Sequence, residues 1–135
     1  IAFPGVHDLI DAAAAAPDWK LSIATSSYLE NSRPTLKAAG IDPGKFNAWI
    51  TGSDVTHKKP HPEIYLVAAR AIGLPPNRCV VAEDAVVGIE AARRAGMKCV
   101  GVTNTFSPEE LSDADLIVDS LEEVDLKILR KLVDA

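Results

Sequence analysis

The sequence contains few features that would place it in a membrane, outside the cell or on a nucleic acid. No apolar run approaches the twenty residues of a membrane-spanning helix, and the opening IAFPGVHDLI lacks the basic flank and cleavage site of a signal peptide. Lys and Arg number 14 against 19 Asp and Glu, so the formal charge of −5 excludes a predominantly basic surface. We therefore expect no membrane or nucleic-acid partner, and a cytoplasmic protein, with an organellar stroma or matrix as the alternative.

Cysteine is scarce, and the glycine-rich motif of dinucleotide-binding proteins is missing. Cys79 and Cys99 both fall in short apolar runs, which favours buried reduced thiols over a disulfide. No G-x-G-x-x-G follows any predicted strand, which argues against a dinucleotide-binding domain. No linker or low-complexity tract divides the 135 residues, a length that suits one domain with one hydrophobic core.

Helical and extended patterns alternate along the chain. Helices are expected at residues 6–16, before Gly40, at 62–72, at 85–95 and at 124–133. Strands are expected at residues 21–24, 48–51, 79–82, 98–102 and within 115–120. Such alternation implies crossover connections and a parallel sheet covered on both faces. The predicted fold is α/β, a three-layer α/β/α sandwich with a mostly parallel sheet.

Two local signals qualify this pattern. Pro34 falls in the helix expected before Gly40, where proline is tolerated only in the first turn. The stretch SPEE matches a capping box, with Ser107 as the N-cap and Glu110 three residues later.

Polar residues follow three of the predicted strands, at the edge where open parallel sheets bind their ligands. Thr-Ser-Ser follows the first strand at residues 25–27, Lys59 lies beyond the second strand, and Glu83 and Asp84 follow the third. Hydroxyl and ammonium groups suit a phosphoryl group, and carboxylates suit Mg²⁺. The sequence therefore predicts an Mg²⁺-dependent phosphoryl-transfer site at this edge.

The ordered set of these motifs resembles the haloacid dehalogenase superfamily, and specifically its β-phosphoglucomutase-like phosphatase branch. LSIATSS resembles the second motif of the family, KKPHPEIY the third and VVAEDAVVGIEAARRAGM the fourth. FPGVHDLI resembles the segment that re-enters the core domain after the helical cap. The resemblance covers essentially the whole chain. It implies a HAD-like, Rossmannoid core and a phosphatase or phosphomutase for a small phosphorylated metabolite such as a sugar phosphate.

The resemblance also implies roles for particular residues. Thr25 and Lys59 are expected to take part in catalysis, and Asp84 and Glu83 to hold Mg²⁺. The residues expected to bind the phosphate carry hydroxyl or ammonium donors: Thr25, Ser26, Ser27 and Lys59.

Each of these residues also has a plain structural alternative. Asp84 could cap the following helix, Thr25 could satisfy a local backbone group, and Lys59 could be a solvated side chain. His57 and His61 do not share a helical face, so we expect surface histidines rather than metal ligands. Many relatives carry Ser where Ala85 stands, and this difference removes one polar contact.

The first motif of the family, an Asp-x-Asp that supplies the nucleophile and a general acid/base, has no counterpart before Thr25. Asp113-Ala114-Asp115 has the pattern but comes late and is interpreted as surface loop. The resemblance therefore implies that residues 1–135 form a single partial core domain without its central first strand and its cap. That strand lies between those ending at Thr25 and Glu83, so its absence would expose two strand edges and an apolar strip.

Three functional hypotheses follow. The first is a fragment of an enzyme whose missing amino-terminal segment, from its own or another chain, completes the sheet and the site; the chain alone is then inactive. The second is a signalling receiver-like domain. It is disfavoured because the acidic pair comes first and Lys last in such domains, whereas here Thr25 precedes Lys59 and the acidic pair comes last. The third is a catalytically inactive HAD-like interaction or structural domain, which is favoured if the 135 residues are the whole protein.

Overall fold

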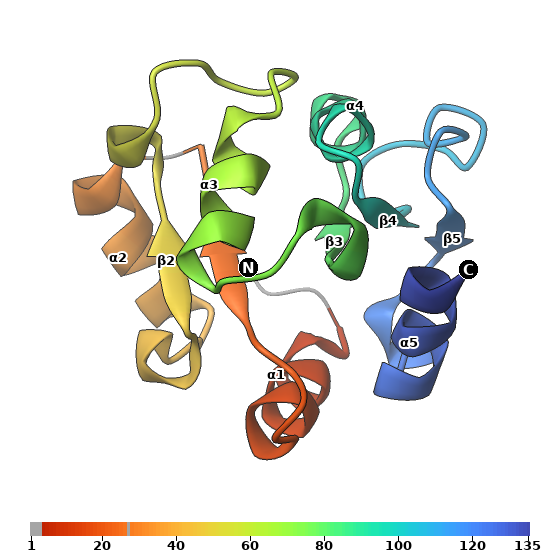
Figure 1. Cartoon of the computed structure of the whole chain (residues 1–135), viewed down its shortest axis with the longest axis horizontal. Coiled ribbons are helices and arrows are strands. Elements are labelled where there is room, and N and C mark those ends of the chain that lie inside the picture. The colour runs from red at the N-terminus through yellow and green to blue at the C-terminus, as the bar shows by residue number, and fades with distance from the viewer. Residues whose placement is uncertain (1–3, 27) are drawn as a thin grey trace.

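The computed structural model describes residues 4–26 and 28–135, apart from the side chain of Leu29. Helices and short strands alternate along these residues (Figure 1). The helices are α1 (Val6–Ala15), α2 (Leu29–Ala38), α3 (Glu63–Ala71), α4 (Val86–Arg94) and α5 (Leu126–Asp134). The strands are β1 (Ser22–Ala24), β2 (Ala48–Ile50), β3 (Val80–Glu83), β4 (Lys98–Val102) and β5 (Leu116–Val118). The predicted order of elements is confirmed.

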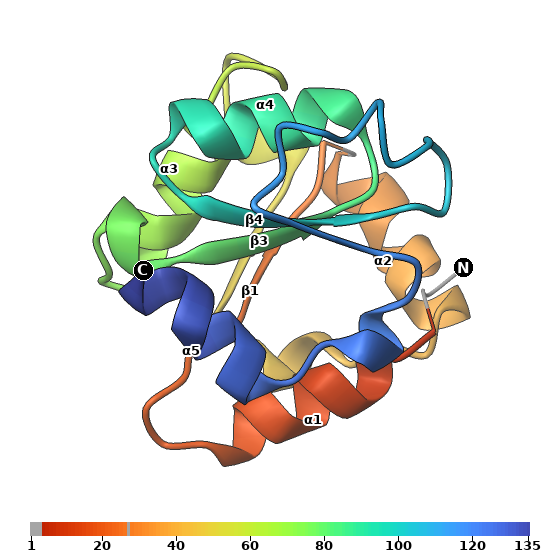
Figure 2. The same ribbon diagram turned by 90° about the vertical axis from the view of Figure 1, so that its right-hand side faces the viewer.

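The helices form layers on the two faces of the strands. Figure 2 shows α3 and α4 above the strands and α1 and α5 below them, while α2 lies beside β2 at one end of the molecule (Figure 1). Every strand pair is parallel. The predicted three-layer α/β/α arrangement is therefore confirmed. No helix in the described ranges is both long and apolar enough to cross a membrane.

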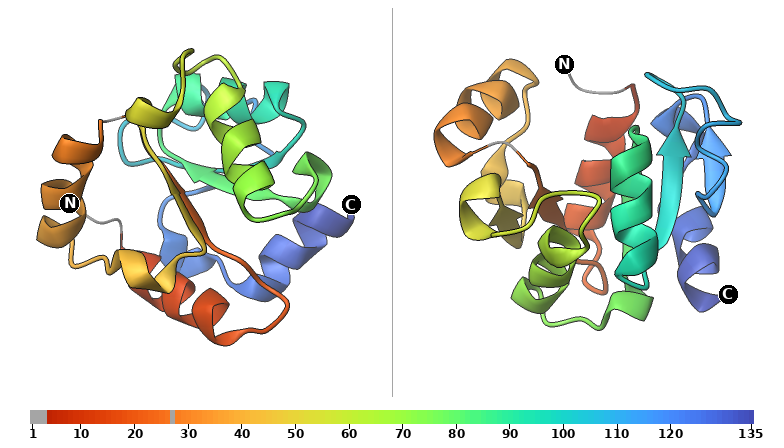
Figure 3. Two further views of the ribbon diagram at one scale, coloured as in Figure 1. Left: turned by 60° about the vertical axis from the view of Figure 1, so that its left-hand side comes forward. Right: turned by 90° about the horizontal axis from the view of Figure 1, so that it is seen from above.

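The strands form two separate sheets. β1 pairs with β2 in one sheet, and β3, β4 and β5 pair in that order in the other. Two further views show the two groups standing apart (Figure 3). Among the described residues no strand bridges β1 and β3 by hydrogen bonds. The break falls where the resemblance places the missing central strand.

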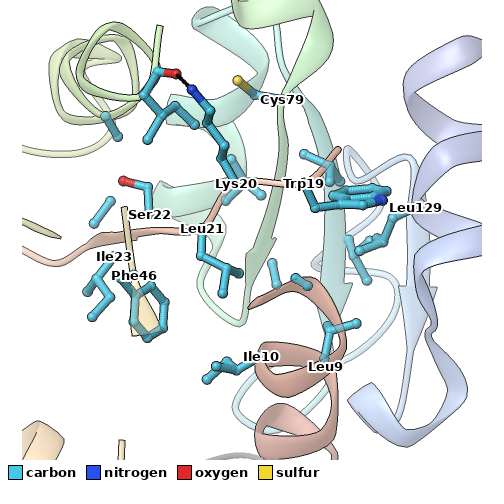
Figure 4. A pocket seen from close by; sticks show the side chains of 18 of the residues that line it. Leu9, Ile10, Trp19, Lys20, Leu21, Ser22, Ile23, Phe46, Cys79 and Leu129 are labelled. Carbon is cyan, nitrogen blue, oxygen red and sulfur yellow. Dashed lines mark hydrogen bonds between the residues drawn. The ribbon is translucent and has the colours of Figure 1, made fainter. Parts of the chain in front are cut away.

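A cavity of about 520 Å³ occupies the space between the two sheets. Side chains of β1 and β3 line it, together with side chains of α1 and α5 (Figure 4). These two helices contact each other. The lining is mostly apolar and includes Leu9, Ile10, Trp19, Leu21, Ile23 and Leu129. The fold thus leaves open an apolar slot flanked by two strand edges.

Two hydrophobic clusters hold the molecule together. The first lies around α3 and α4 and contains the fully buried Ile64, Ile89 and Leu111. Because α3 contacts β1, β2 and α4, this cluster links the two sheets. The second contains Val100 and Val102 of β4, Val118 of β5 and Leu129 of α5. The two sheets are therefore joined through their helices rather than through a shared strand.

Three local expectations have different outcomes. Pro34 lies inside α2 and beyond its first turn, so the expectation that proline would be confined to the first turn was wrong. Because proline has no N–H, the helix lacks one backbone hydrogen bond at this position. The predicted capping box is present: the Ser107 N–H donates to Glu110 Oε1 at 3.1 Å, and the Glu110 N–H donates to Ser107 Oγ at 3.3 Å. Turns rather than a helix follow Ser107. Cys79 and Cys99 are free thiols, as predicted, but only Cys99 is buried, and its burial raises the pKa of its thiol to about 12.

Candidate active site

A buried carboxylate stands at the carboxyl end of β3. Oε2 of Glu83 accepts hydrogen bonds from Lys59 Nζ at 3.0 Å and from the Tyr65 hydroxyl at 2.7 Å. Oε1 accepts the backbone N–H groups of Asp84 and Ala85 at 3.1 and 3.2 Å. The Lys59 and Glu83 side chains are only 13% and 10% exposed. The ion pair is thus well shielded from solvent, and four donors surround the carboxylate.

The surroundings of Glu83 keep it ionised. Burial alone would raise the pKa of Glu83, but the Lys59 ammonium and the hydrogen bonds from Tyr65, Lys59 and Ala85 together hold it below its usual 4.5. Burial first, and the charge of Glu83 second, raise the pKa of the Tyr65 hydroxyl well above its ordinary value. Tyr65 therefore stays protonated and can donate to Glu83 at any physiological pH.

Gly88 makes room for this carboxylate. A Cβ atom at position 88 would lie 2.0 Å from both Cδ and Oε2 of Glu83, far inside van der Waals contact. Gly88 is buried in α4, where glycine costs about 1 kcal/mol relative to alanine. The close approach of helix and carboxylate explains why a glycine stands there.

Asp84 has a different environment from its neighbour. Its Oδ2 accepts a hydrogen bond from Thr105 Oγ1 at 2.9 Å, and within the described ranges Oδ1 accepts none. The N-cap of α4 is Ala85, which makes no side-chain capping bond, so the alternative that Asp84 caps this helix is wrong. Asp84, the residue after Glu83, is thus half-buried and keeps one carboxylate oxygen that accepts no hydrogen bond from the described residues.

The hydroxyl residues expected to bind phosphate lie at the end of β1. The Thr25 N–H donates to the Ile50 carbonyl at 3.0 Å, which extends the β1–β2 ladder by one residue. Thr25 and Ser26 are half-buried, and Ser27 lies outside the described residues. The structure thus brings Lys59, Glu83 and Asp84 together and places Thr25 after the strand that flanks the other side of the cavity. Contact of these hydroxyls with a phosphoryl group stays a prediction.

The histidines near Lys59 lie on the surface, as expected. His57 and His61 are exposed and stack with their ring centroids 4.6 Å apart. The part of the chain that the structure describes contains no group of three or more His, Cys, Asp or Glu residues able to hold a metal ion. A metal ion held by Asp84 would therefore need further ligands from outside this set of residues.

Three residues of this cluster received no firm role from the sequence. Tyr65 falls within KKPHPEIY, but a tyrosine on the apolar face of an amphipathic helix is first interpreted as a residue of the hydrophobic core. Gly88 gave a clearer signal, because an isolated glycine inside a helical pattern usually has a packing reason. Thr105 follows β4 and reaches Asp84, 21 positions away along the chain.

Fold and site together define an open α/β protein with charged residues gathered at the carboxyl end of a parallel strand. Residues 1–96 match the model of the haloacid dehalogenase-like hydrolase family. The chain belongs to this family, and the resemblance seen in its motifs is confirmed.

Curated relatives include phosphatases. Validoxylamine A 7'-phosphate phosphatase of Streptomyces hygroscopicus subsp. limoneus is 40% identical over 107 residues, which are 77% of this chain and 48% of that protein. Protein CbbY of Cereibacter sphaeroides is 36% identical over 124 residues, 90% of this chain and 54% of that protein. The chain thus spans about half the length of these relatives.

Solved structures show the same fold. CbbY from Rhodobacter sphaeroides in complex with phosphate superimposes with a TM-score of 0.86 at 35% identity, over 95% of this chain and 58% of that one. β-Phosphoglucomutase from Clostridium difficile superimposes with a TM-score of 0.83 at 31% identity, over 98% and 56%. Both likenesses support the phosphatase and phosphoglucomutase branch of the family.

Proposed function

We propose that this chain is the partial core domain of an Mg²⁺-dependent phosphatase or phosphomutase that acts on a small phosphorylated metabolite such as a sugar phosphate. The observation that carries the proposal is the shielded ion pair of Lys59 with Glu83 at the carboxyl end of β3, where Asp84 is the next residue of the chain. A fixed cation beside a carboxylate suits a phosphoryl group and its metal. Relatives named as phosphatases and a phosphoglucomutase support the same chemistry.

In this proposal the chain positions and neutralises the phosphoryl group. Lys59 contacts a phosphoryl oxygen and offsets the negative charge of the transferring group, while Thr25, Ser26 and Ser27 donate from the end of β1. An aspartate outside this chain attacks phosphorus, the bond from phosphorus to the leaving oxygen breaks, and an aspartyl-phosphate forms. Attack by water on that intermediate gives a phosphatase, and attack by a sugar hydroxyl gives a phosphomutase.

The donors present fit part of an Mg²⁺ site. Mg²⁺ is usually held by one or two carboxylates together with substrate phosphate and water. The free oxygen of Asp84 suits one such position, whereas the oxygens of Glu83 already accept four hydrogen bonds. We therefore propose Asp84 as the main Mg²⁺ ligand from this chain, and Glu83 as a weaker candidate for the same role. When bound, the metal supplies charge neutralisation at the phosphoryl oxygens.

We propose further that the slot between β1 and β3 receives a β-strand from an amino-terminal segment of the same protein. Two strand edges flank the slot, its lining is mostly apolar, and the chain covers about half of its relatives. A parallel strand there would end at the same edge as Glu83 and so deliver a nucleophile close to Lys59. A segment of another chain is the alternative occupant.

The proposal is tested on the complete protein with a panel of sugar phosphates. We expect phosphate release or transfer that requires Mg²⁺ and falls at least about a hundredfold in Lys59→Ala and in Asp84→Asn, since each removes a charge at the phosphoryl group. Lys45→Ala is the matched control, because Lys45 forms an exposed ion pair with Asp11. Full activity in Lys59→Ala would contradict the proposal.

A second candidate is a catalytically inactive interaction domain on the same fold. It is favoured by one observation, the lack of an Asp-x-Asp before Thr25 in these 135 residues. The coding sequence upstream of Ile1 separates the two candidates. An Asp-x-Asp motif there supports the enzyme, and an open reading frame that starts at this point supports the inactive domain.

The location of the protein also remains a proposal. Two free thiols support a cytoplasmic or other reducing compartment. One relative, Protein SUPPRESSOR OF QUENCHING 1 of Arabidopsis thaliana, is chloroplastic by name and 37% identical over 114 residues, but the match covers only 11% of that protein. An organellar stroma or matrix therefore stays the alternative.

A further inference from the structure

The Glu83 carboxylate accepts hydrogen bonds from three segments of the chain. Lys59 reaches it from the segment before α3, Tyr65 reaches it from within α3, and the N–H groups of Asp84 and Ala85 reach it from the β3–α4 junction. An ionised carboxylate has about four acceptor positions, and four donors are present. The orientation of this carboxylate is therefore fixed from several directions at once.

Tyr65 contacts both members of the Lys59–Glu83 ion pair. Its hydroxyl donates to Oε2 of Glu83 at 2.7 Å, and the centroid of its ring lies 5.0 Å from Lys59 Nζ. The side chain is packed in the core at 5% exposure, so its own position is determined by the cluster around α3 and α4. Tyr65 thus connects the hydrophobic core to the charged end of β3.

We propose that Tyr65 is a positioning residue, which fixes Glu83 and through it holds the Lys59 ammonium where the phosphoryl group binds. The inference rests on the proposed function. Removal of the hydroxyl leaves Oε2 with Lys59 as its single partner among the described residues, so that carboxylate and ammonium can move as a pair. Gly88 serves the same end, because only a residue without a side chain leaves the carboxylate in place.

The first test is a double-mutant cycle in the complete protein. Tyr65→Phe removes only the hydroxyl, and we expect kcat/KM to fall roughly three- to tenfold, the scale of one hydrogen bond to a charged group. In a Lys59→Ala background the same change should alter kcat/KM less than about twofold, because the residue that Tyr65 positions is gone. Equal losses in the two backgrounds would overturn the proposal, since a general structural role acts whether or not Lys59 is present.

Ile64→Val is the matched control for this cycle. Ile64 is the neighbour of Tyr65 on α3 and is fully buried, and no hydrogen bond joins it to Glu83. We expect Ile64→Val to lower the unfolding temperature without changing kcat/KM. A rate loss in Ile64→Val equal to that in Tyr65→Phe would mean that any weakening of this core slows the reaction, and would contradict the inference.

The second test does not depend on activity. NMR of ¹⁵N-labelled complete protein is expected to show a slowly exchanging Nζ–H signal of Lys59 near neutral pH, because this ammonium is shielded and hydrogen-bonded. The signal should be lost in Tyr65→Phe and in Gly88→Ala and kept in Ile64→Val. A wild type without the signal, or a Tyr65→Phe variant that retains it, would overturn the inference. If the wild type transfers no phosphate, the proposed function fails while this measurement still decides the role of Tyr65.

Discussion

Glu83 and Asp84 are adjacent carboxylates with different surroundings. Four donors enclose Glu83, whereas Asp84 accepts one hydrogen bond, from Thr105, and is partly exposed. A buried carboxylate that loses its charge leaves its cationic partner uncompensated, which costs several kcal/mol. Loss of charge at Asp84 has no such effect on the fold. Substitutions at the two positions should therefore separate stability from metal binding.

Stability should depend on pH through Glu83. The pKa of Glu83 in the folded protein lies below the usual 4.5, so under more acidic conditions the unfolded chain takes up a proton that the folded protein does not. The free energy of unfolding must then fall as pH decreases below about 4.5. Relative to Glu83→Gln, the wild type should be markedly more stable at about pH 7, and this difference should shrink as the pH is lowered to values below about 4.5.

Urea denaturation of the complete protein across this range measures the effect. Glu90→Gln is the control, because the ion pairs of Glu90 with Arg93 and Arg94 lie at the surface. A wild-type advantage over Glu83→Gln that is the same at every pH would rule out the charge of Glu83 as its source.

Asp84→Asn should weaken Mg²⁺ binding without weakening the fold. The amide keeps the shape of the side chain and an oxygen for the Thr105 hydroxyl, but it removes the negative charge. We expect the affinity for Mg²⁺ in the presence of phosphate to fall at least about tenfold, with the unfolding free energy changed by less than about 0.5 kcal/mol. Calorimetric titration of the complete protein provides the number, and unchanged Mg²⁺ affinity would exclude Asp84 as a ligand.

At the scale of elements, α4 packs closely against the strands but begins without a cap. Ala91 and Ala92 are completely buried, and these small side chains allow the helix to approach the sheet. The N-cap residue Ala85 has extended backbone angles but no oxygen to offer, so the first N–H groups of α4 receive no side-chain bond from it. By contrast, the N-cap of α5 is Asp125, whose side chain accepts the N–H of Ile128 at 2.9 Å.

Ala85→Ser should therefore stabilise the protein. A serine at an N-cap is worth about 0.5–2 kcal/mol relative to alanine, and the angles φ −113° and ψ 143° are those of an N-cap residue. Thermal unfolding measures the gain, with Asp125→Ala as the reciprocal change expected to lose a similar amount. If Ala85→Ser has no effect, another contact already satisfies the helix terminus.

The order and type of the elements followed from the sequence because short apolar runs and amphipathic periods are local properties. The fixed position of Glu83 did not, since its partners Lys59 and Tyr65 lie 24 and 18 positions away. The position of Pro34 in its helix was wrongly predicted for a similar reason. Whether a helix tolerates the loss of one hydrogen bond depends on its packing and not on the local sequence alone. Local pattern thus located the ends of the strands, and packing decided what the side chains do there.

At the scale of the whole molecule, two parallel sheets are joined through helices, and no strand of residues 4–26 and 28–135 belongs to both sheets. The apolar slot between β1 and β3 offers backbone groups on two sides, which makes it a suitable place for one more parallel strand. The proposed nucleophile would reach the site on that strand. Fold completion and catalysis are therefore expected to depend on the same segment.

The 135-residue chain alone should release no phosphate from a generic aryl phosphate. It carries Lys59 and Asp84, but the nucleophile that the mechanism requires is not among its residues before Thr25. Circular dichroism and a thermal transition establish first that the purified chain is folded. Hydrolysis by the folded chain that is abolished by Lys59→Ala would show that the site needs no other segment.

The central claim is that Lys59, Thr25 and Asp84 surround one phosphoryl group. A crystal structure of the complete protein with Mg²⁺ and orthovanadate tests it most directly. We predict vanadate oxygens within hydrogen-bonding distance of Lys59 Nζ and Thr25 Oγ1, the metal on Asp84, and a new strand between β1 and β3. Vanadate bound elsewhere, with Lys59 contacting Glu83 alone, would contradict the claim.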